Sequence, residues 1–553
     1  MPHGRSIREG QSHFAAGRHA VAQRLESLAV DIWLGALLLF CAASGCGTSP
    51  PAVPAEASPT VDSQPAESSA SASESPAPAS PSAPRETWDV FYIEGSQIGH
   101  GWTRYERVTE NGRELLNIKG EQSMAIRRFG QKITQQIKLE SWELPDGQVL
   151  RFTSEMYDGT ARITSKGVYE KGQMKIETTT LGKTQAASIP WDPSWGGFFS
   201  SEQRLEQRPL KPGEKRAFLA LMPIFNQASQ VTFEATGRES TELLDGKREL
   251  LHVKSTVQIG QTTIASDSWT DESGATLKSV LPSLNQVSYR TTKERALAEP
   301  AQSSNFDLGT SSVVKVERKL ERPHDTRRIV YRATMPNGDP ARHFESGASQ
   351  MVRSIDEHNA EITVRALRPD SPQDSFPADA APTEAERKPN GFLQSDDAEV
   401  KRLAVSVAAG ETDPWKIACT LERLVRDTVR VKDFSQAVAT AADVARTHEG
   451  DCTEHAVLLA AMCRARDIPA RVAIGLVYFG PVGGFAYHMW TEVWIDRHWV
   501  PIDGTLGRGG IGAAHLKITH SSLEGSDSFT AFLPVIELLG QLKLEITAMD
   551  EGA

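Results

Sequence analysis

The chain has 553 residues, a formal net charge of -11 at pH 7 and five cysteines. This length allows about three or four domains. The mildly acidic balance gives no electrostatic support for a role in nucleic-acid binding. Five cysteines in a chain of this length do not make a disulfide scaffold.

Residues 1–46 resemble an export signal. Four arginines precede an apolar run from Ile32 to Ala43, and this run is too short for a comfortable membrane span. The run ends in Ala43-Ser44-Gly45-Cys46, and small residues before a cysteine resemble a bacterial lipoprotein processing site. We therefore expect export, lipidation of Cys46 and anchoring to the periplasmic face of the cell envelope. An ordinary signal peptide or an uncleaved anchor is the alternative.

Residues 47–85 consist mainly of Pro, Ser and Ala, with a few acidic residues and no aromatic ones. Such a segment cannot bury enough apolar surface to order itself. It is predicted to be a disordered linker that tethers the folded part to a membrane.

Residues 86–300 contain alternating apolar and polar runs, for example over 132–139, which turn signals such as Asn111-Gly112 interrupt. This spacing predicts an antiparallel, meander-like β domain. The aromatic loop 191–199 either binds a ligand or partner or, as we favour, plugs the end of the sheet.

Further strand-like runs at 313–317, 329–333 and 361–366 predict a small β module over residues 301–370. A linker rich in Pro and charged residues is expected over 371–393.

A last domain is expected over residues 394–553, and it opens with helical signals. Ser395 can cap a helix through Val407, and Asp413-Pro414 opens a second helix to about Val429.

Cys452 falls in the first turn of a third predicted helix. Apolar side chains recur at helical spacing from Thr453 to Arg466, and Asp451 with Glu454 forms a capping-box-like pattern. The free N–H groups and the dipole at a helix start favour a thiolate. The same N–H groups can donate to an oxyanion on an attacked carbonyl.

A predicted β-hairpin supplies a histidine and an aspartate. Residues 487–495 and 498–502 are rich in aromatic and β-branched residues, with Asp496-Arg497 between them. In that register Asp503 lies diagonal to His488 on one face of the hairpin. A carboxylate there can hold the imidazole in one tautomer while its other nitrogen serves a cysteine.

Simpler interpretations exist for each residue. A lone cysteine at a helix start is more often structural, and a lone histidine on a strand is usually a surface or core residue. His455 could compete as the base, but its position fixes it to the cysteine helix. A zinc site of Cys452, His455 and His488 is rejected because the paired-cysteine spacing is absent. We expect no metal and no cofactor.

The stretch resembles the transglutaminase-like superfamily, whose papain-related core carries Cys on a helix and His and Asp on successive strands. The matching pieces are residues 442–444, 464–472, 488–493 and 499–505. The resemblance covers roughly residues 395–520. It implies Cys452 as nucleophile, His488 as base and Asp503 as the residue that orients the base. The predicted fold class is thus α+β, with this core following antiparallel β domains.

The resemblance implies cysteine-dependent acyl transfer on protein or peptide amides through a thioester, with an amine or water as acceptor. Crosslinking, deamidation and proteolysis all stay open. Trp490, Glu492 and Asp451 are further candidates for the wall of the site, although we favour structural use for Trp490 and Glu492. The competing hypothesis is a retired enzyme whose β domains serve as an envelope scaffold or a peptide binder.

Overall fold

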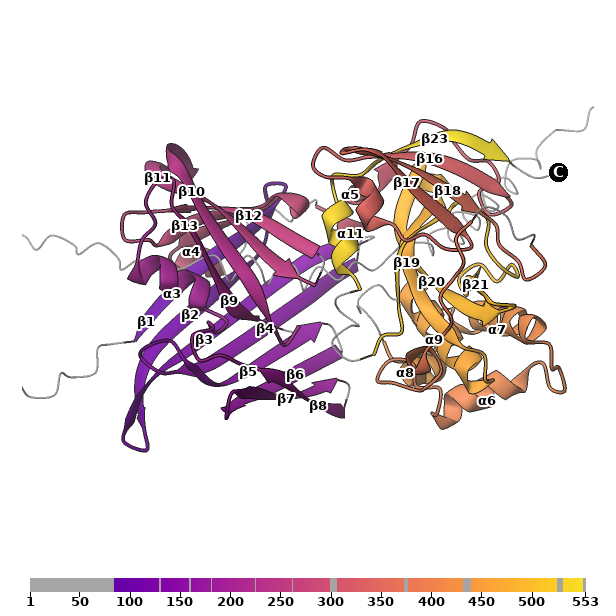
Figure 1. Ribbon diagram of the computed structural model, residues 1–553, viewed down its shortest axis with the longest axis horizontal. Coiled ribbons are helices and arrows are strands. Elements are labelled where there is room, and N and C mark those ends of the chain that lie inside the picture. Colours follow the sequence, from indigo (N-terminus) through magenta and orange to yellow (C-terminus); the bar gives the residue numbers. More distant parts are fainter. Residues whose placement is uncertain are drawn as a thin grey trace, which may run out of the picture.

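The computed structural model describes residues 84–128, 131–158, 161–180, 182–223, 225–260, 262–298, 306–371, 376–430, 439–524 and 531–550. The predicted export signal with Cys46, and nearly all of the predicted tether, lie outside these ranges. The described residues form a large β domain, a small sheet and a mixed helix–sheet unit (Figure 1). Among them, no helix is both long and apolar enough to cross a membrane.

The large β domain is one antiparallel sheet in which neighbours along the chain pair with each other, as the turn spacing predicts, except β8 and β9, which form its two opposite edges. The first and last strands of this region, β1 and β14, also pair and so join the two halves. The spatial order is β8 (Lys183–Pro190), β7 (Gln173–Thr180), β6 (Ala161–Glu170), β5 (Val149–Asp158), β4 (Gln131–Glu143), β3 (Arg113–Arg128), β2 (Ser96–Glu110), β1 (Arg85–Ile93), β14 (Gln286–Thr291), β13 (Thr276–Leu281), β12 (Thr262–Thr270), β11 (Gly246–Ile259), β10 (Gln227–Leu243) and β9 (Lys215–Met222).

Aromatic rings pack onto glycines on the inner face of this sheet. A Cβ added at Gly167 would lie 2.0 Å from Phe152 Cε1, and one at Gly120 would lie 2.8 Å from Phe199 Cε1. Phe199 and Trp191 are 5% and 3% exposed, so these rings of the aromatic loop pack into the sheet, whereas Trp195 is partly buried. The short helices of this domain are α3 (Ser200–Gln207), η2 (Pro282–Leu284) and α4 (Lys293–Leu297).

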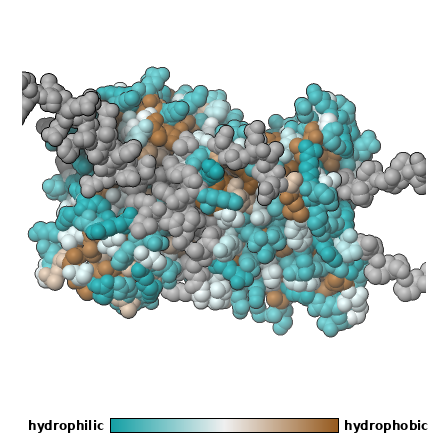
Figure 2. Space-filling model, turned by 180° about the vertical axis from the view of Figure 1, so that it is seen from behind, coloured by the Kyte–Doolittle hydropathy of each residue, from teal (hydrophilic) through white to brown (hydrophobic). Residues whose placement is uncertain are grey.

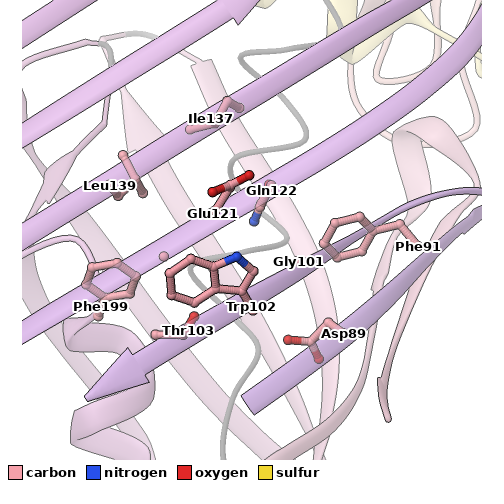
Figure 3. Close-up of a pocket in the computed structure, with 11 residues that line it drawn as sticks. Asp89, Phe91, Gly101, Trp102, Thr103, Glu121, Gln122, Ile137, Leu139 and Phe199 are labelled. Carbon is pink, nitrogen blue, oxygen red and sulfur yellow. The ribbon is translucent and has the colours of Figure 1, made fainter. Parts of the chain in front are cut away.

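Little space is left between strands β1 to β4 and the aromatic loop 191–199. A cavity of about 20 Å³ lies there, with Phe199 and Phe91 at opposite ends of its lining (Figure 3). That volume holds roughly one water molecule. This part of the β domain is therefore a packed core.

The small sheet has the order β17 (Gln350–Asp356), β18 (Asn359–Arg365), β16 (Arg328–Thr334) and β23 (Lys543–Asp550). Its last strand comes from the C-terminal end of the range that we assigned to the catalytic domain. Pairing of β23 with β16 brings the end of the chain back onto the predicted β module. Helix η3 (Pro340–His343) packs on this sheet, whereas α5 (Leu308–Ser311) packs on β3 of the large β domain. Helix η4 (Glu384–Glu386) follows β18 in the chain.

The mixed unit places helices around α9 (Cys452–Ala465), whose side chains are buried from Cys452 to Arg464. The other helices are α6 (Ala398–Ser406), α7 (Pro414–Thr428) and α8 (Ala441–Thr447). Asp413 caps α7 as predicted, whereas α6 is capped by Asp397 rather than Ser395, because the Asp397 carboxylate accepts from two backbone N–H groups. The sheet has the order β15 (Val314–Lys315), β20 (Gly484–Ile495), β19 (Ala470–Phe479) and β22 (His515–Ser521). Strand β21 (His498–Ile502) pairs with β20, and η5 (Gly480–Val482) joins β19 to β20.

A short helix, α11 (Leu533–Leu538), lies between the units. The Glu537 carboxylate accepts from the backbone N–H of Thr263 at 3.0 Å and lies 2.9 Å from His343 Nδ1. One side chain of α11 thus links the large β domain to the small-sheet region. Seen from behind, the described surface is mainly hydrophilic, with hydrophobic side chains in scattered groups (Figure 2).

Candidate active site

Cys452 is the first residue of α9, where the sequence predicts it. The Asp451 carboxylate accepts from Thr453 N at 2.9 Å, and Glu454 accepts from Asp451 N at 2.9 Å, so the capping box is complete. Gly450 has φ +143°, and a Cβ there would lie 2.3 Å from the Glu454 Cβ. Only glycine fits before this cap, and the sulfur-bearing residue is held at a helix start.

The hairpin has the predicted register. Ile495 pairs with His498, and the intervening Asp496 and Arg497 both have positive φ, as a tight two-residue turn requires. The chain leaves β21 at Ile502.

Asp503 follows directly. His488 Nε2 donates to Asp503 Oδ2 at 2.8 Å, and both side chains are fully buried. The structure therefore brings two of the three predicted catalytic residues into direct contact.

Hydrogen bonds reach both oxygens of the Asp503 carboxylate. Its Oδ1 accepts from Thr505 N at 2.8 Å and from Thr505 Oγ1 at 2.6 Å. Burial favours the neutral acid, but the charge of His488 and the hydrogen bonds from His488 and His515 outweigh burial and hold the pKa of Asp503 well below its usual range. The carboxylate is therefore ionised and rigidly placed.

Glu422 of α7 supports the loop that carries Asp503. Its carboxylate accepts from the backbone N–H groups of Asp503 at 2.9 Å and of Gly509 at 2.6 Å. Burial raises the pKa of Glu422 to about 7, although these backbone donors oppose the shift. Sequence reasoning missed this residue because α7 is far from the motifs along the chain.

The other nitrogen of His488, Nδ1, is buried and has no hydrogen-bond partner among the described residues. Cys452 is fully buried, and its helix packs on the strand of His488, with Thr491 Oγ1 donating to Ala456 O at 3.0 Å. The hydrogen bond from Cys452 to His488 that a formed triad shows is therefore not made at Nδ1 in this structure. Catalytic hydrogen bonds are often long before substrate binds.

The remaining predicted residues take different places. Trp490 is stacked beside His488, with ring centroids 6.3 Å apart and an interplanar angle of 23°. Glu492 instead accepts from Arg471 Nε at 2.7 Å and from Lys517 Nζ at 2.9 Å. Burial opposes ionisation, but these two cations hold the pKa of Glu492 below its usual value. Asp451 serves as the helix cap. The His455 imidazole bonds the carbonyl of Asp451, which fixes it along its own helix.

His515 is a second histidine at the site, and the sequence analysis assigned no role to it. Its Nε2 lies 3.3 Å from Asp503 Oδ2, the same oxygen that His488 contacts. The ligand atoms of His488, Asp503 and His515 lie within 4.8 Å of one another, so this cluster is the one group in the described ranges that could hold a metal ion. The hydrogen bonds to Asp503 already satisfy both Nε2 atoms, and we assign no metal to the cluster.

Part of the chain matches a known protein family. A family model described as the transglutaminase-like superfamily matches residues 401–504. No curated protein sequence matches the chain.

Similar solved structures cover parts of the chain. A putative cysteine protease from Cytophaga hutchinsonii has 16% identity and a TM-score of 0.26, and the match covers 39% of this chain and 83% of that one. The periplasmic domain of TgpA from Pseudomonas aeruginosa bound to ethylmercury has 13% identity and a TM-score of 0.22, covering 33% and 91%. A β-barrel-like protein of a domain of unknown function from Brucella abortus has 10% identity and a TM-score of 0.29, covering 38% and 95%. These scores are too low to carry an argument. The family match is the finding that bears on this chain: residues 401–504 match the model of the transglutaminase-like superfamily.

Proposed function

We propose that the C-terminal unit is a cysteine-dependent acyl-transfer enzyme that acts on protein or peptide amides through a thioester. One observation carries the proposal. The buried His488 imidazole is bound to Asp503 through Nε2, while its buried Nδ1 has no hydrogen-bond partner among the described residues. Leaving a buried polar atom unpaired costs about 1–3 kcal/mol. A group that receives a proton during turnover accounts for such a cost.

The chemistry follows from these positions. The Cys452 thiolate attacks the amide carbonyl carbon, so a C–S bond forms and the carbonyl oxygen becomes an oxyanion. The oxyanion forms at the start of α9, where the helix dipole favours negative charge. When the oxyanion collapses the C–N bond breaks, and Nδ1 of protonated His488 gives its proton to the leaving amine.

The acceptor then resolves the thioester. An amine or a water molecule gives a proton to His488 and attacks the carbonyl carbon, and the C–S bond breaks. The amine route crosslinks and the water route deamidates or hydrolyses. Asp503 keeps Nε2 engaged throughout, so Nδ1 is the nitrogen that exchanges the proton.

Full burial of Cys452 favours a second candidate, a catalytically retired envelope scaffold or peptide binder. The two candidates differ in one respect. An enzyme must open to its substrate and must hold a reactive thiolate near neutral pH, whereas a scaffold needs neither.

Alkylation of the full-length chain with iodoacetamide at about pH 6.5, located by peptide mass spectrometry, tests the proposal. A catalytic thiolate reacts well below the ordinary thiol pKa of about 8.5. We expect label on Cys452, and loss of that label in His488→Ala.

Two internal controls are available in the described fold. Burial raises the pKa of the Cys419 thiol to about 11 and raises that of Cys463 still further. Both should stay unlabelled, and Cys463→Ala should leave the labelling of Cys452 unchanged. An unreactive Cys452, or labelling that ignores His488, supports the retired scaffold instead.

Incubation with a biotinylated primary amine and a glutamine-rich protein then separates the acceptors. Amine incorporation that disappears in Cys452→Ala indicates transglutamination. Conversion of glutamine to glutamate, or chain cleavage, indicates water as acceptor.

We further propose that the chain is exported and anchored to the envelope through Cys46. Its support is the sequence pattern of residues 1–46. Metabolic labelling with a fatty-acid analogue should mark the wild-type chain and not Cys46→Ala. Equal labelling of both would remove Cys46 from this role.

A further inference from the structure

Asp503 Oδ2 is shared by two imidazoles from different strands. His488 lies on β20, where it pairs with Gly475 of β19, and His515 lies on β22, where it pairs with Val477 of β19. Their Nε2 atoms lie 2.8 Å and 3.3 Å from the same oxygen. A single carboxylate oxygen rarely serves two ring nitrogens unless both donate.

His515 is the neutral partner of this pair. Burial lowers its pKa, and the hydrogen bond to Asp503, the charge of Asp503 and the backbone of Gly512 oppose that shift only in part. An ionised carboxylate can only accept, so the single N–H of neutral His515 must be on Nε2. The titratable groups around it are Asp503, His488 and His324, and the His324 ring centroid lies 5.8 Å away. Burial lowers the pKa of His324 to about 3, so this neighbour is neutral as well.

We propose that His515 is a positioning residue. Its N–H donates a hydrogen bond to Asp503 Oδ2 and so weakens the interaction of the Asp503 carboxylate with protonated His488. His515 need not hold the carboxylate in place, because Thr505 and the loop above Glu422 already do so. Its effect is therefore electrostatic. Two donors on one oxygen compete for its negative charge.

The sign of the effect follows. The N–H dipole of His515 points its positive end at the oxygen that stabilises the His488 imidazolium. Removing that dipole leaves more negative charge facing His488, so the pKa of His488 should rise. A weaker hold makes His488 a better proton donor to the leaving amine, which is the step that the proposed function assigns to it.

The test uses the full-length chain labelled with ¹⁵N-histidine, in a Cys452→Ala background so that the imidazole titrates without the thiol. His488→Asn identifies the His488 signal. In His515→Leu, which keeps volume and loses the donor, we expect the pKa of His488 to rise by about half a unit or more. His515→Gln restores an N–H near the position of Nε2 and should return the pKa toward the wild-type value. His324→Leu, which alters a neighbour that does not bond Asp503, should leave it unchanged.

A His488 titration that superimposes for the wild type and His515→Leu, or one that moves to lower pH, overturns the proposal. Near-ultraviolet circular dichroism shows whether the leucine variant is folded. If it is not, the comparison of His515→Gln with His515→Asn decides, since the shorter amide cannot reach Oδ2 and should give the raised pKa.

This role belongs to the triad of the proposed function, but the titration does not require Cys452 to react. An inert Cys452 in the alkylation assay refutes the enzyme while the His488 shift still stands. An active enzyme with no shift refutes the role of His515 alone.

Discussion

Replacing Glu143 with Gln should change the pH dependence of the stability of the β domain. Glu143 is fully buried at the end of β4. Its carboxylate accepts from Ser141 Oγ at 2.7 Å and from Gln203 Nε2 at 3.3 Å. A Cβ on Gly197 would lie only 2.4 Å from Glu143 Oε1, so backbone packs against the carboxylate and water is excluded. Burial raises the pKa of Glu143 to about 7, against the two hydrogen bonds.

The direction and the size of this pH dependence follow from the different proton affinities of Glu143 in the folded and unfolded chain. In the unfolded chain this carboxyl has an ordinary pKa of 4.5, and in the folded chain about 7. The folded state therefore binds the proton more tightly. The stability contributed by the group is complete below pH 4.5 and is lost as pH rises through 7. At roughly 1.4 kcal/mol for each tenfold change in proton affinity, the loss is about 3 kcal/mol.

Glutamine keeps the shape of Glu143 and cannot ionise. The Glu143→Gln variant should therefore not lose this stability as pH rises. We expect the free energy of opening of β4 and β5, from hydrogen exchange of their peptides, to favour the variant by about 3 kcal/mol more at about pH 8.5 than at about pH 4.5. Comparing variant and wild type at each pH cancels the intrinsic exchange rate. Glu140→Gln is the control, because Glu140 lies on the same strand and is part-exposed. The reasoning is refuted if the free energy of opening differs between variant and wild type by the same amount at both pH values. It is also refuted if the difference favours the variant more at low pH.

Three further changes test other parts of the structure. Gly167→Ala places a methyl about 2 Å from the Phe152 ring and should lower the thermal stability of the β domain by about 1–3 kcal/mol, with Phe152→Leu restoring part of the loss. Asp503→Asn offers an amide where His488 needs an acceptor, and it should slow alkylation of Cys452 at about pH 6.5 by about 10³-fold with unchanged circular dichroism; a loss under tenfold would contradict the triad. Because Cys452 is fully buried, its alkylation rate should increase in urea below the global unfolding transition, and a flat rate there would exclude opening of the site as a slow step.

Local chemistry explains which parts of the site could be predicted from the sequence. The cap of α9 depends on residues within four positions of one another, and the hairpin register depends on a two-residue turn. The contact between His488 and Asp503 follows once that register is known. These features depend on residues that lie close together in the sequence, so they can be predicted without knowing which distant residues are neighbours in the fold.

The parts of the site and of the fold that the sequence did not predict depend on pairing between strands that are far apart in the chain. His515 reaches Asp503 because β22 pairs with β19, on the opposite side of that strand from β20, and nothing near His515 in the chain indicates this pairing. Glu492 faces Arg471 through the register of β19 and β20, so its ion pair was equally hidden. The pairing of β23 with β16 joins segments more than two hundred positions apart, and no local pattern predicts it.

The balance of hydrogen bonds around Asp503, His488 and His515 supports the proposed site over ordinary core packing. All four acceptor positions of Asp503 are filled by donors from Thr505, His488 and His515. A core that needed only to be stable would gain more from apolar side chains than from a buried anion with its partners. Such an arrangement is useful where a neighbouring imidazole must gain and lose a proton. The one atom left unsatisfied on His488 is the nitrogen that Asp503 does not hold. Among the described residues, the hydrogen-bond network stops at Nδ1 of His488 and at Nδ1 of His515, and the first of these is the nitrogen that exchanges the proton in the proposed mechanism.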